Sequence, residues 1–226
     1  MRRLPLALCA AALLSAGFDD PKPGDKHLGL EPPAGAVVLF DGKDLSAWTG
    51  RDGKPARWPV AEGSFAVGPK LGDIKTARAF GDFALHVEFQ IPLMPDARGQ
   101  ARGNSGVYLG GVHELQVLDS FGLKPQANDC GAIYQQIIPA VNACKPPLRW
   151  QSYDITFRKA RVEAGKVAAR ARVTVVQNDL TIIDDKPIDP TPGGISMEPG
   201  KDGPILLQDH GNDVRFRNIW IVPAAK

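Results

Sequence analysis

The sequence is poor in the residues that often identify a function directly. Its 226 residues include only 3 cysteines and 4 histidines, and no cysteine–histidine spacing resembles a structural zinc site. Basic residues number 27 and acidic residues 25, which gives a net charge of +2 without a polybasic run. Because nucleic-acid binding needs a concentrated positive field, we predict no DNA or RNA partner.

The sequence also lacks an apolar run suited to a membrane span. The segment LPLALCAAALLSAG after the two N-terminal arginines is short and rich in alanine. A charged start, an apolar stretch and a small-residue exit are typical of a secretory signal. We therefore predict a signal peptide over residues 1–17, cleavage near Ala16–Gly17, and a periplasmic or secreted protein. Cys9 comes early and follows the bulky Leu8, which argues against a lipoprotein.

Removal of this signal leaves two cysteines, Cys130 and Cys144. An even pair in an exported chain indicates a disulfide bond. The bond would close a loop of roughly 15 residues, which contributes about 3 kcal/mol in the chain-entropy model. Two free thiols are the alternative.

Helical periodicity is missing from the chain, whereas strand signals recur between turns rich in glycine and proline. Residues 83–90 alternate cleanly, with Phe83, Leu85, Val87 and Phe89 on one face. We predict an all-β fold in which two antiparallel sheets pack face to face. It forms a single domain over residues 35–226, after a leader over residues 18–34 that is loose or lies along the surface. No internal repeat is present, which argues against a propeller or solenoid.

The stretch RGNSGVYLGGVHELQVLDSFG places polar side chains in a predicted hairpin. A turn at Gly110-Gly111 would put two polar rows side by side on one face. Similar patterns recur in CGAIYQQI and in GPILLQDHG. Amide, phenol and imidazole groups combine donors and acceptors and match sugar hydroxyls, whereas a plain solvated face usually carries Lys, Glu and Thr. We interpret this face as a sugar-binding surface, formed by Asn104, Tyr108, Glu114, Gln116, Tyr134, Gln208 and His210.

Four blocks carry a family resemblance: LFDGKDLSAWTG, RGNSGVYLGGVHELQVLDSFG, CGAIYQQIIPAVNACKPPLRWQSYDITF and GPILLQDHGNDVRFRNIWI, in this order. The chain resembles the bacterial 3-keto-disaccharide hydrolases, also described as 3-keto-glucoside lyases and 3-keto-2-hydroxyglucal hydratases. The resemblance implies a concanavalin-like jelly-roll sandwich with a grooved face. It also implies a glycoside or small oligosaccharide substrate that a separate sugar oxidoreductase has oxidised to a ketone at carbon 3. We predict no organic cofactor.

A ketone at carbon 3 acidifies the proton on carbon 2, so cleavage by elimination needs one base near neutral pKa and a group that stabilises the enolate. We predict Glu114 and His210 as the catalytic pair. Both are also candidate ligands for one divalent metal ion acting as Lewis acid. Tyr108 is a candidate stacking platform for the sugar ring. The predicted substrate-binding residues are Arg102, Asn104, Tyr108, Gln116, Asp119, Tyr134 and Gln208.

Two other functions fit the same surface. A conventional retaining glycoside hydrolase needs two carboxyl groups about 5 Å apart. On a regular strand Glu114 and Asp119 would be about 16 Å apart and on opposite faces, so this alternative is weaker. A non-catalytic carbohydrate-binding module would need neither Glu114 nor His210 as a reactive group.

Overall fold

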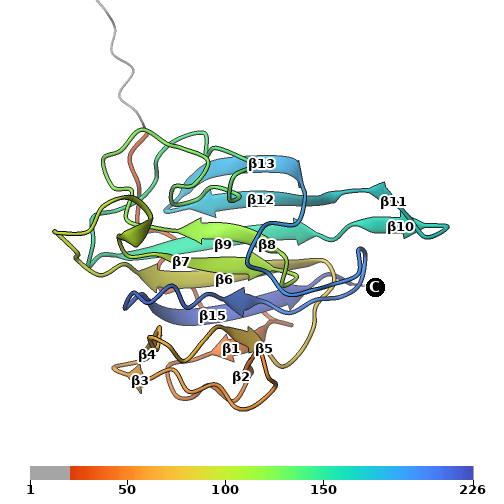
Figure 1. Ribbon diagram of the computed structural model, residues 1–226, viewed down its shortest axis with the longest axis horizontal. Helices are drawn as coiled ribbons and strands as arrows, with labels where there is room; N and C mark the ends of the chain where they lie inside the picture. The colour runs from red at the N-terminus through yellow and green to blue at the C-terminus, as the bar shows by residue number, and fades with distance from the viewer. Residues whose placement is uncertain (1–20, 226) are drawn as a thin grey trace, which may run out of the picture.

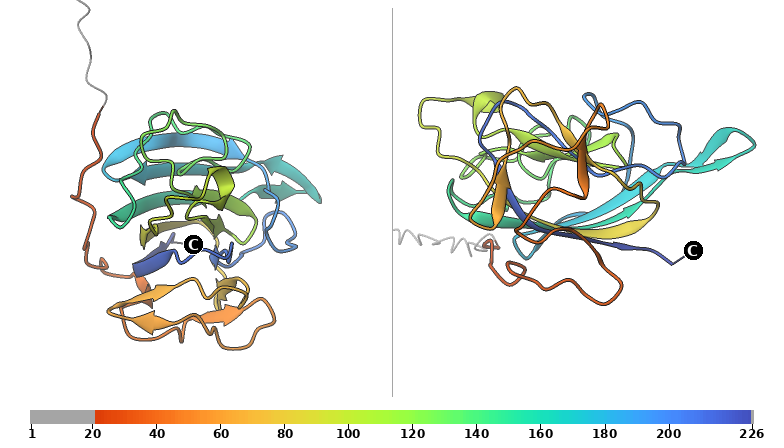
Figure 2. Two further views of the ribbon diagram at one scale, coloured as in Figure 1. Left: turned by 60° about the vertical axis from the view of Figure 1, so that its left-hand side comes forward. Right: turned by 90° about the horizontal axis from the view of Figure 1, so that it is seen from below.

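The computed structural model describes residues 21–225 and consists of two antiparallel β-sheets packed face to face (Figures 1 and 2). This confirms the predicted all-β, concanavalin-like sandwich. The larger sheet has eight strands, in which β1 (Val37–Phe40) pairs with β15 beside the main path. That path runs through β13 (Leu180–Ile188), β12 (Ala171–Gln177), β9 (Trp150–Arg158), β6 (Phe83–Gln90), β15 (Arg215–Pro223), β4 (Ser64–Ala66) and β3 (Val60–Ala61).

The smaller sheet has five strands and covers one face of the larger sheet. A separate two-stranded hairpin projects from one end of the sandwich (Figure 1) and consists of β10 (Arg161–Glu163) and β11 (Lys166–Ala169). The described part of the chain contains no α-helix, only the short 3₁₀ turn Gly99–Ala101. The order of the smaller sheet is β2 (Trp48–Gly50), β5 (Ile74–Thr76), β14 (Leu206–Leu207), β7 (Ser105–Leu109) and β8 (His113–Val117).

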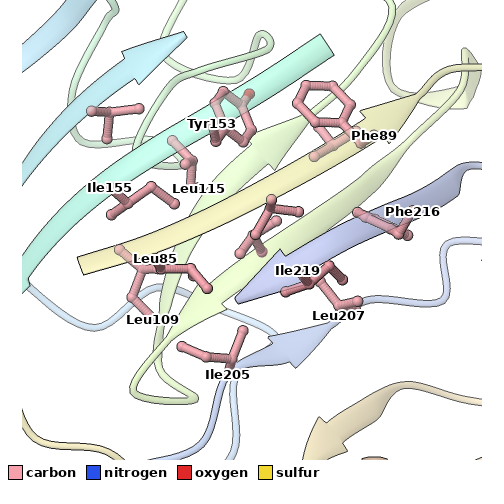
Figure 3. Close-up of a cluster of buried hydrophobic side chains, with 14 of the residues drawn as sticks. Leu85, Phe89, Leu109, Leu115, Tyr153, Ile155, Ile205, Leu207, Phe216 and Ile219 are labelled. Atoms are coloured by element: carbon pink, nitrogen blue, oxygen red, sulfur yellow. The ribbon is translucent and has the colours of Figure 1, made fainter. Parts of the chain in front are cut away.

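The core between the sheets follows from strand alternation. In β6 the side chains of Leu85 and Phe89 point inward, where Phe89 packs against Tyr153 of β9 with ring centroids 4.7 Å apart. Leu109 and Leu115 of the smaller sheet enter the same cluster (Figure 3). Each buried side chain of this size contributes roughly 1.5–3 kcal/mol. The hydrophobic effect therefore fixes which face of every strand remains for polar groups.

Residues 21–34 of the leader lie along the outer face of the larger sheet (Figure 2). The backbone N–H of Gly29 donates to Glu88 at 2.6 Å, and Nδ1 of His27 lies 2.6 Å from the Asp154 carboxylate. The carbonyl of Leu30 accepts a hydrogen bond from Asn218 at 3.0 Å. These contacts cover His86 and Glu88, which β6 turns away from the core.

Glu88 is a fully buried carboxylate with many donors. Burial alone would raise its pKa, but hydrogen bonds from His86, Asn218, Gly29 and Arg217 outweigh that effect and lower the pKa from 4.5 to about 2. Burial also opposes charge on His86, yet its contacts with Asp154 and Glu88 raise its pKa. The outer face of the larger sheet is therefore held by a charged, internally paired cluster.

The predicted disulfide is absent from the structure. Cys130 and Cys144 are both buried free thiols. The two thiols interact with each other, and each has a further polar neighbour: the Cys130 sulfur lies 3.2 Å from the Tyr153 hydroxyl, and the Cys144 sulfur lies 3.4 Å from the carbonyl of Lys145. Packing in the core thus holds these side chains without a covalent link.

The predicted signal peptide, residues 1–17, lies outside the described residues, as does Cys9. Within residues 21–225, no helix has the length and apolar character needed to cross a membrane.

Replacing the buried carboxylate in Glu88→Gln should destabilise the fold by about 3 kcal/mol at pH 7, since a pKa difference of one unit corresponds to 1.36 kcal/mol. Because the pKa of Glu88 is lower in the folded protein, its ionised form stabilises the fold above pH 4.5, and this stabilisation is lost as the pH falls toward about 2. Urea unfolding should therefore give a difference in free energy of unfolding between wild type and variant that is smaller at pH 3 than at pH 7. The exposed Glu163→Gln in the β10–β11 hairpin is the matched control and should change little. A difference in free energy of unfolding that stays constant with pH would contradict the lowered pKa of Glu88.

Candidate active site

The hairpin formed by β7 and β8 places the polar side chains predicted from its sequence on one face. Tyr108 lies opposite Glu114, and Gly106 lies opposite Gln116, in the antiparallel register. Between them Val107 pairs across from a core leucine and is fully buried. Because alternate residues point to opposite faces, the tyrosine, glutamate and glutamine share the outer face of the smaller sheet.

A hollow of about 140 Å³ lies over this outer face. It gathers every predicted site residue except Arg102 and Asp119, and it brings Glu114 and His210 to the same side of the sandwich. The roles of these residues stay predictions, whereas their convergence is a property of the fold. The hollow is lined by Gln100, Asn104, Tyr108, Glu114, Gln116, Tyr134, Pro192, Gly193, Gln208 and His210.

Arg102 and Asp119 contact each other instead of the hollow. Nε of Arg102 donates to the backbone carbonyl of Asp119 at 2.8 Å and lies 3.2 Å from its carboxylate. Arg102 precedes β7 and Asp119 follows β8, so the pair closes the open end of the hairpin. Their predicted role in substrate binding stays a prediction, since neither residue is among those that line the hollow.

Neighbouring segments deliver the remaining side chains. Leu206 of β14 pairs with Tyr108 of β7, which carries the following Gln208 to the hollow and His210 to its exposed rim. The predicted strand around Tyr134 is replaced by a loop with isolated bridges, one of which lies beside β8. There the backbone N–H of Tyr134 donates to the carbonyl of Glu114 at 3.1 Å.

Glu114 is a buried carboxylate with few donors. Its residue is 3% exposed, and one carboxylate oxygen accepts a hydrogen bond from the Tyr108 hydroxyl at 2.9 Å. Burial raises the pKa of Glu114, the Tyr108 hydrogen bond lowers it, and the negative charge of Asp73 raises it again, to about 7. A carboxylate with this pKa can both accept and return a proton near neutral pH.

Tyr108 acts through its hydroxyl and cannot be an exposed stacking platform. The residue has no exposed surface. Its oxygen also lies 3.0 Å from the carbonyl of Pro192 and accepts a hydrogen bond from Gln208 at 3.2 Å. Burial and the neighbouring charge of Glu114 both raise the pKa of this phenol, so it stays protonated. Stacking was predicted because sequence shows the aromatic ring but not the loop that covers it.

Two glycines leave space for the side chains of Tyr108 and Glu114. A Cβ on Gly106 would lie 2.9 Å from a carboxylate oxygen of Glu114, and one on Gly193 would lie 2.5 Å from the Tyr108 hydroxyl. Gly193 also has φ of +84°, which side chains rarely adopt. Gly193, Pro192 and Gln100 could not be predicted from the sequence, because they come from segments without a periodic pattern.

The arrangement does not form a recognisable metal centre. Among residues 21–225, no three His, Cys, Asp or Glu side chains are grouped so that they could hold a metal ion. Glu114 and His210 would be the only ligands of these types from the lining of the hollow. A divalent ion at this pair stays a prediction, and the mechanism below contains no step through a metal.

Comparison with known proteins identifies the family. Residues 35–222 match the family described as the 3-keto-alpha-glucoside-1,2-lyase-like domain. The chain belongs to this family. Membership of the 3-keto-alpha-glucoside-1,2-lyase-like family makes it a carbohydrate-active protein and confirms the resemblance seen in the sequence blocks.

Individual relatives agree with this assignment. A 3-keto-disaccharide hydrolase of Bacteroides thetaiotaomicron is 28% identical, over 83% of this chain and 78% of its own. A Parabacteroides distasonis protein provisionally described as a glycosyl hydrolase is 36% identical, with a TM-score of 0.81 over 98% of this chain and 100% of its own. A second structure from that organism, 21% identical with a TM-score of 0.62 over 84% of this chain and 94% of its own, shares the fold.

The two influences on Glu114 can be separated by substitutions with opposite effects. Tyr108→Phe removes a hydrogen bond to the carboxylate and should raise the pKa of Glu114 above about 7. Asp73→Asn removes a nearby negative charge and should lower it. Carbon-13 NMR of the carboxyl group, assigned through Glu114→Gln, measures both. Shifts of the same sign in the two variants, or a wild-type pKa near 4.5, would disprove this electrostatic description.

Proposed function

We propose that this protein is an exported enzyme that cleaves 3-keto-glycosides by elimination across carbon 1 and carbon 2. The family assignment and the activity for which the B. thetaiotaomicron relative is named support the substrate class. The single observation that carries the mechanism is the buried carboxylate of Glu114, which has a pKa of about 7 and lines a polar hollow.

Glu114 is the base. The ketone at carbon 3 makes the carbon 2 proton acidic, and a carboxylate oxygen of Glu114 removes it. The electron pair of the C2–H bond passes into an enolate whose oxygen is at carbon 3. Donors are then needed at that oxygen, since negative charge develops there. Tyr134 and His210 line the same hollow and carry the groups suited to this role.

Expulsion of the glycosidic oxygen completes the elimination. The enolate electrons form a double bond between carbon 1 and carbon 2, the ketone is restored, and the C1–O bond breaks. His210, at the exposed rim, donates the proton that the departing oxygen takes up. The products are a free alcohol and a 3-keto-2-hydroxyglucal. Addition of water to carbon 1 of this glucal would give the 3-keto sugar, so elimination and hydration together amount to hydrolysis.

Conventional hydrolysis by two carboxylates has less support. Glu114 is the only carboxylate among the described residues that line the hollow. The other candidate, Asp119, is paired with Arg102 at 3.2 Å. A retaining or inverting glycosidase requires a second acid beside the bond it cleaves. Elimination needs one base and one donor, which the hollow supplies.

The substrate would reach the enzyme already oxidised. A 3-keto-glycoside forms from an ordinary glycoside by loss of two electrons and two protons at carbon 3, so a separate sugar oxidoreductase must act first. The predicted signal peptide places this enzyme in the periplasm or outside the cell. No contact between the two proteins is required, because the 3-keto-glycoside itself can diffuse.

Incubation of the mature protein with a 3-keto-glucoside should release a 3-keto-2-hydroxyglucal as the first product detected by mass. Glu114→Gln should lower kcat by about 10²–10⁴-fold, the usual contribution of a positioned base. His210→Ala should lower it as well, and Glu163→Gln, which alters an exposed hairpin, serves as the matched control. Reactions with and without a chelator test the predicted divalent ion.

Three results would overturn the proposal. Full activity in Glu114→Gln and His210→Ala would show that these two residues are not the catalytic pair. Glycan binding without any turnover would identify a carbohydrate-binding module, and hydrolysis of an unoxidised β-glucan would identify a conventional glucanase.

A further inference from the structure

Three amide side chains of the hollow have an unusual hydrogen-bonding pattern. The side-chain oxygens of Asn104, Gln116 and Gln208 are buried and have no donor among the described residues. A buried acceptor without a partner costs about 1–3 kcal/mol, so such atoms are rare unless water, an ion or a ligand completes them. All three residues line the hollow over Glu114.

Gln100 fixes the orientation of two of these amides. The Asn104 side-chain nitrogen donates to the backbone carbonyl of Gln100 at 2.8 Å, and that of Gln116 donates to the side-chain oxygen of Gln100 at 3.1 Å. The Gln100 amide is itself held, because its nitrogen donates to the carbonyl of Asn128 at 2.8 Å. A backbone carbonyl can only accept. Both nitrogens are therefore directed at Gln100, and both oxygens are left for another partner.

The hydrogen-bonded pair of Tyr108 and Glu114 fixes the third amide. The Tyr108 hydroxyl has one proton, which goes to an acceptor, Glu114 at 2.9 Å or the Pro192 carbonyl at 3.0 Å. Its lone pair therefore faces the Gln208 side chain at 3.2 Å, where only an N–H can complete the bond. The Gln208 oxygen is again the free atom.

From this pattern we propose that the hollow recognises a sugar through three hydroxyl donors, one for each amide oxygen of Asn104, Gln116 and Gln208. The inference rests on the proposed function. A 3-keto-glucosyl ring has lost its carbon 3 hydroxyl and its glycosidic oxygen carries no proton. The hydroxyls that remain are at carbons 2, 4 and 6, which equals the number of free acceptors.

Specificity follows from this complementarity. A neutral 3-keto-hexosyl ring with a hydroxymethyl group has one hydroxyl for each of the three oxygens. A pentose lacks the carbon 6 hydroxyl, and a uronic acid places a carboxylate against acceptors and beside Glu114. Gln100 acts as a positioning residue, since its backbone carbonyl and side-chain oxygen hold the amides of Asn104 and Gln116.

Ratios of kcat/KM between a parent 3-keto-glucoside and its 2-deoxy, 4-deoxy and 6-deoxy counterparts test the proposal within each variant. Wild type should discriminate against each missing hydroxyl by about tenfold, the effect of leaving one buried acceptor unpaired. Asn104→Ala, Gln116→Met and Gln208→Met should each abolish discrimination at one hydroxyl and retain it elsewhere. Because each ratio is internal to one variant, partial misfolding does not affect it.

The positioning role of Gln100 predicts a separate pattern. Gln100→Leu removes the acceptor for Gln116 but keeps the backbone carbonyl that holds Asn104. The kcat/KM ratio for the hydroxyl bound by Gln116 should fall most. The ratio for the hydroxyl bound by Asn104 should fall less, and the ratio for the hydroxyl bound by Gln208 should not change. A merely destabilising change would alter the three ratios together or leave them unchanged.

The outcomes distinguish this inference from the proposed function. No turnover of any 3-keto-glycoside would end the proposed function, and the inference with it. Turnover with equal kcat/KM for parent and deoxy substrates would leave the function and overturn the inference. If a chelator abolishes all three discriminations at once, the amide oxygens bind a cation, and the inference is again wrong.

Discussion

The hydrogen bond between Tyr108 and Glu114 is the interaction on which the rest of the candidate site depends. It exists because the register of β7 and β8 places the two residues opposite each other on a face that the core does not use. Gly106 and Gly193 leave space for the carboxylate and the phenol. The bond keeps one oxygen of a buried, easily protonated carboxylate in place and fixes the amide of Gln208.

Two glutamates among the described residues are buried, and their pKa values move in opposite directions. This difference distinguishes a structural carboxylate from one suited to acid–base chemistry. Glu88 receives donors from the leader, from His86 and from Arg217, so its pKa falls to about 2 and it is charged at neutral pH. Glu114 has a single side-chain donor, so burial prevails and its pKa rises to about 7. The first carboxylate holds a sheet face together. The second is able to exchange a proton with a substrate, which is the pattern expected of an acid–base group.

Much of the fold could be predicted from sequence because it depends on alternation. Phe83 to Gln90 and the hairpin of Tyr108 and Glu114 sort into inner and outer faces by period two, and the structure confirms both. Contacts between separate segments do not follow from alternation. The ion pair between Arg102 and Asp119 across the hairpin ends has no signal in the sequence. Number and compartment indicated that Cys130 and Cys144 pair, and their side chains do interact, but as free thiols.

The most direct test of the central claim follows the hydrogen on carbon 2. A 3-keto-glucoside labelled with deuterium at carbon 2 is incubated with the wild-type protein, with Glu114→Gln, and without protein to correct for spontaneous enolisation. If Glu114 acts as the base of an elimination, the label passes to solvent with each cleavage in the wild type, and at only the spontaneous rate in the variant. Cleavage by wild type that retains deuterium at carbon 2 of the released sugar would contradict the account.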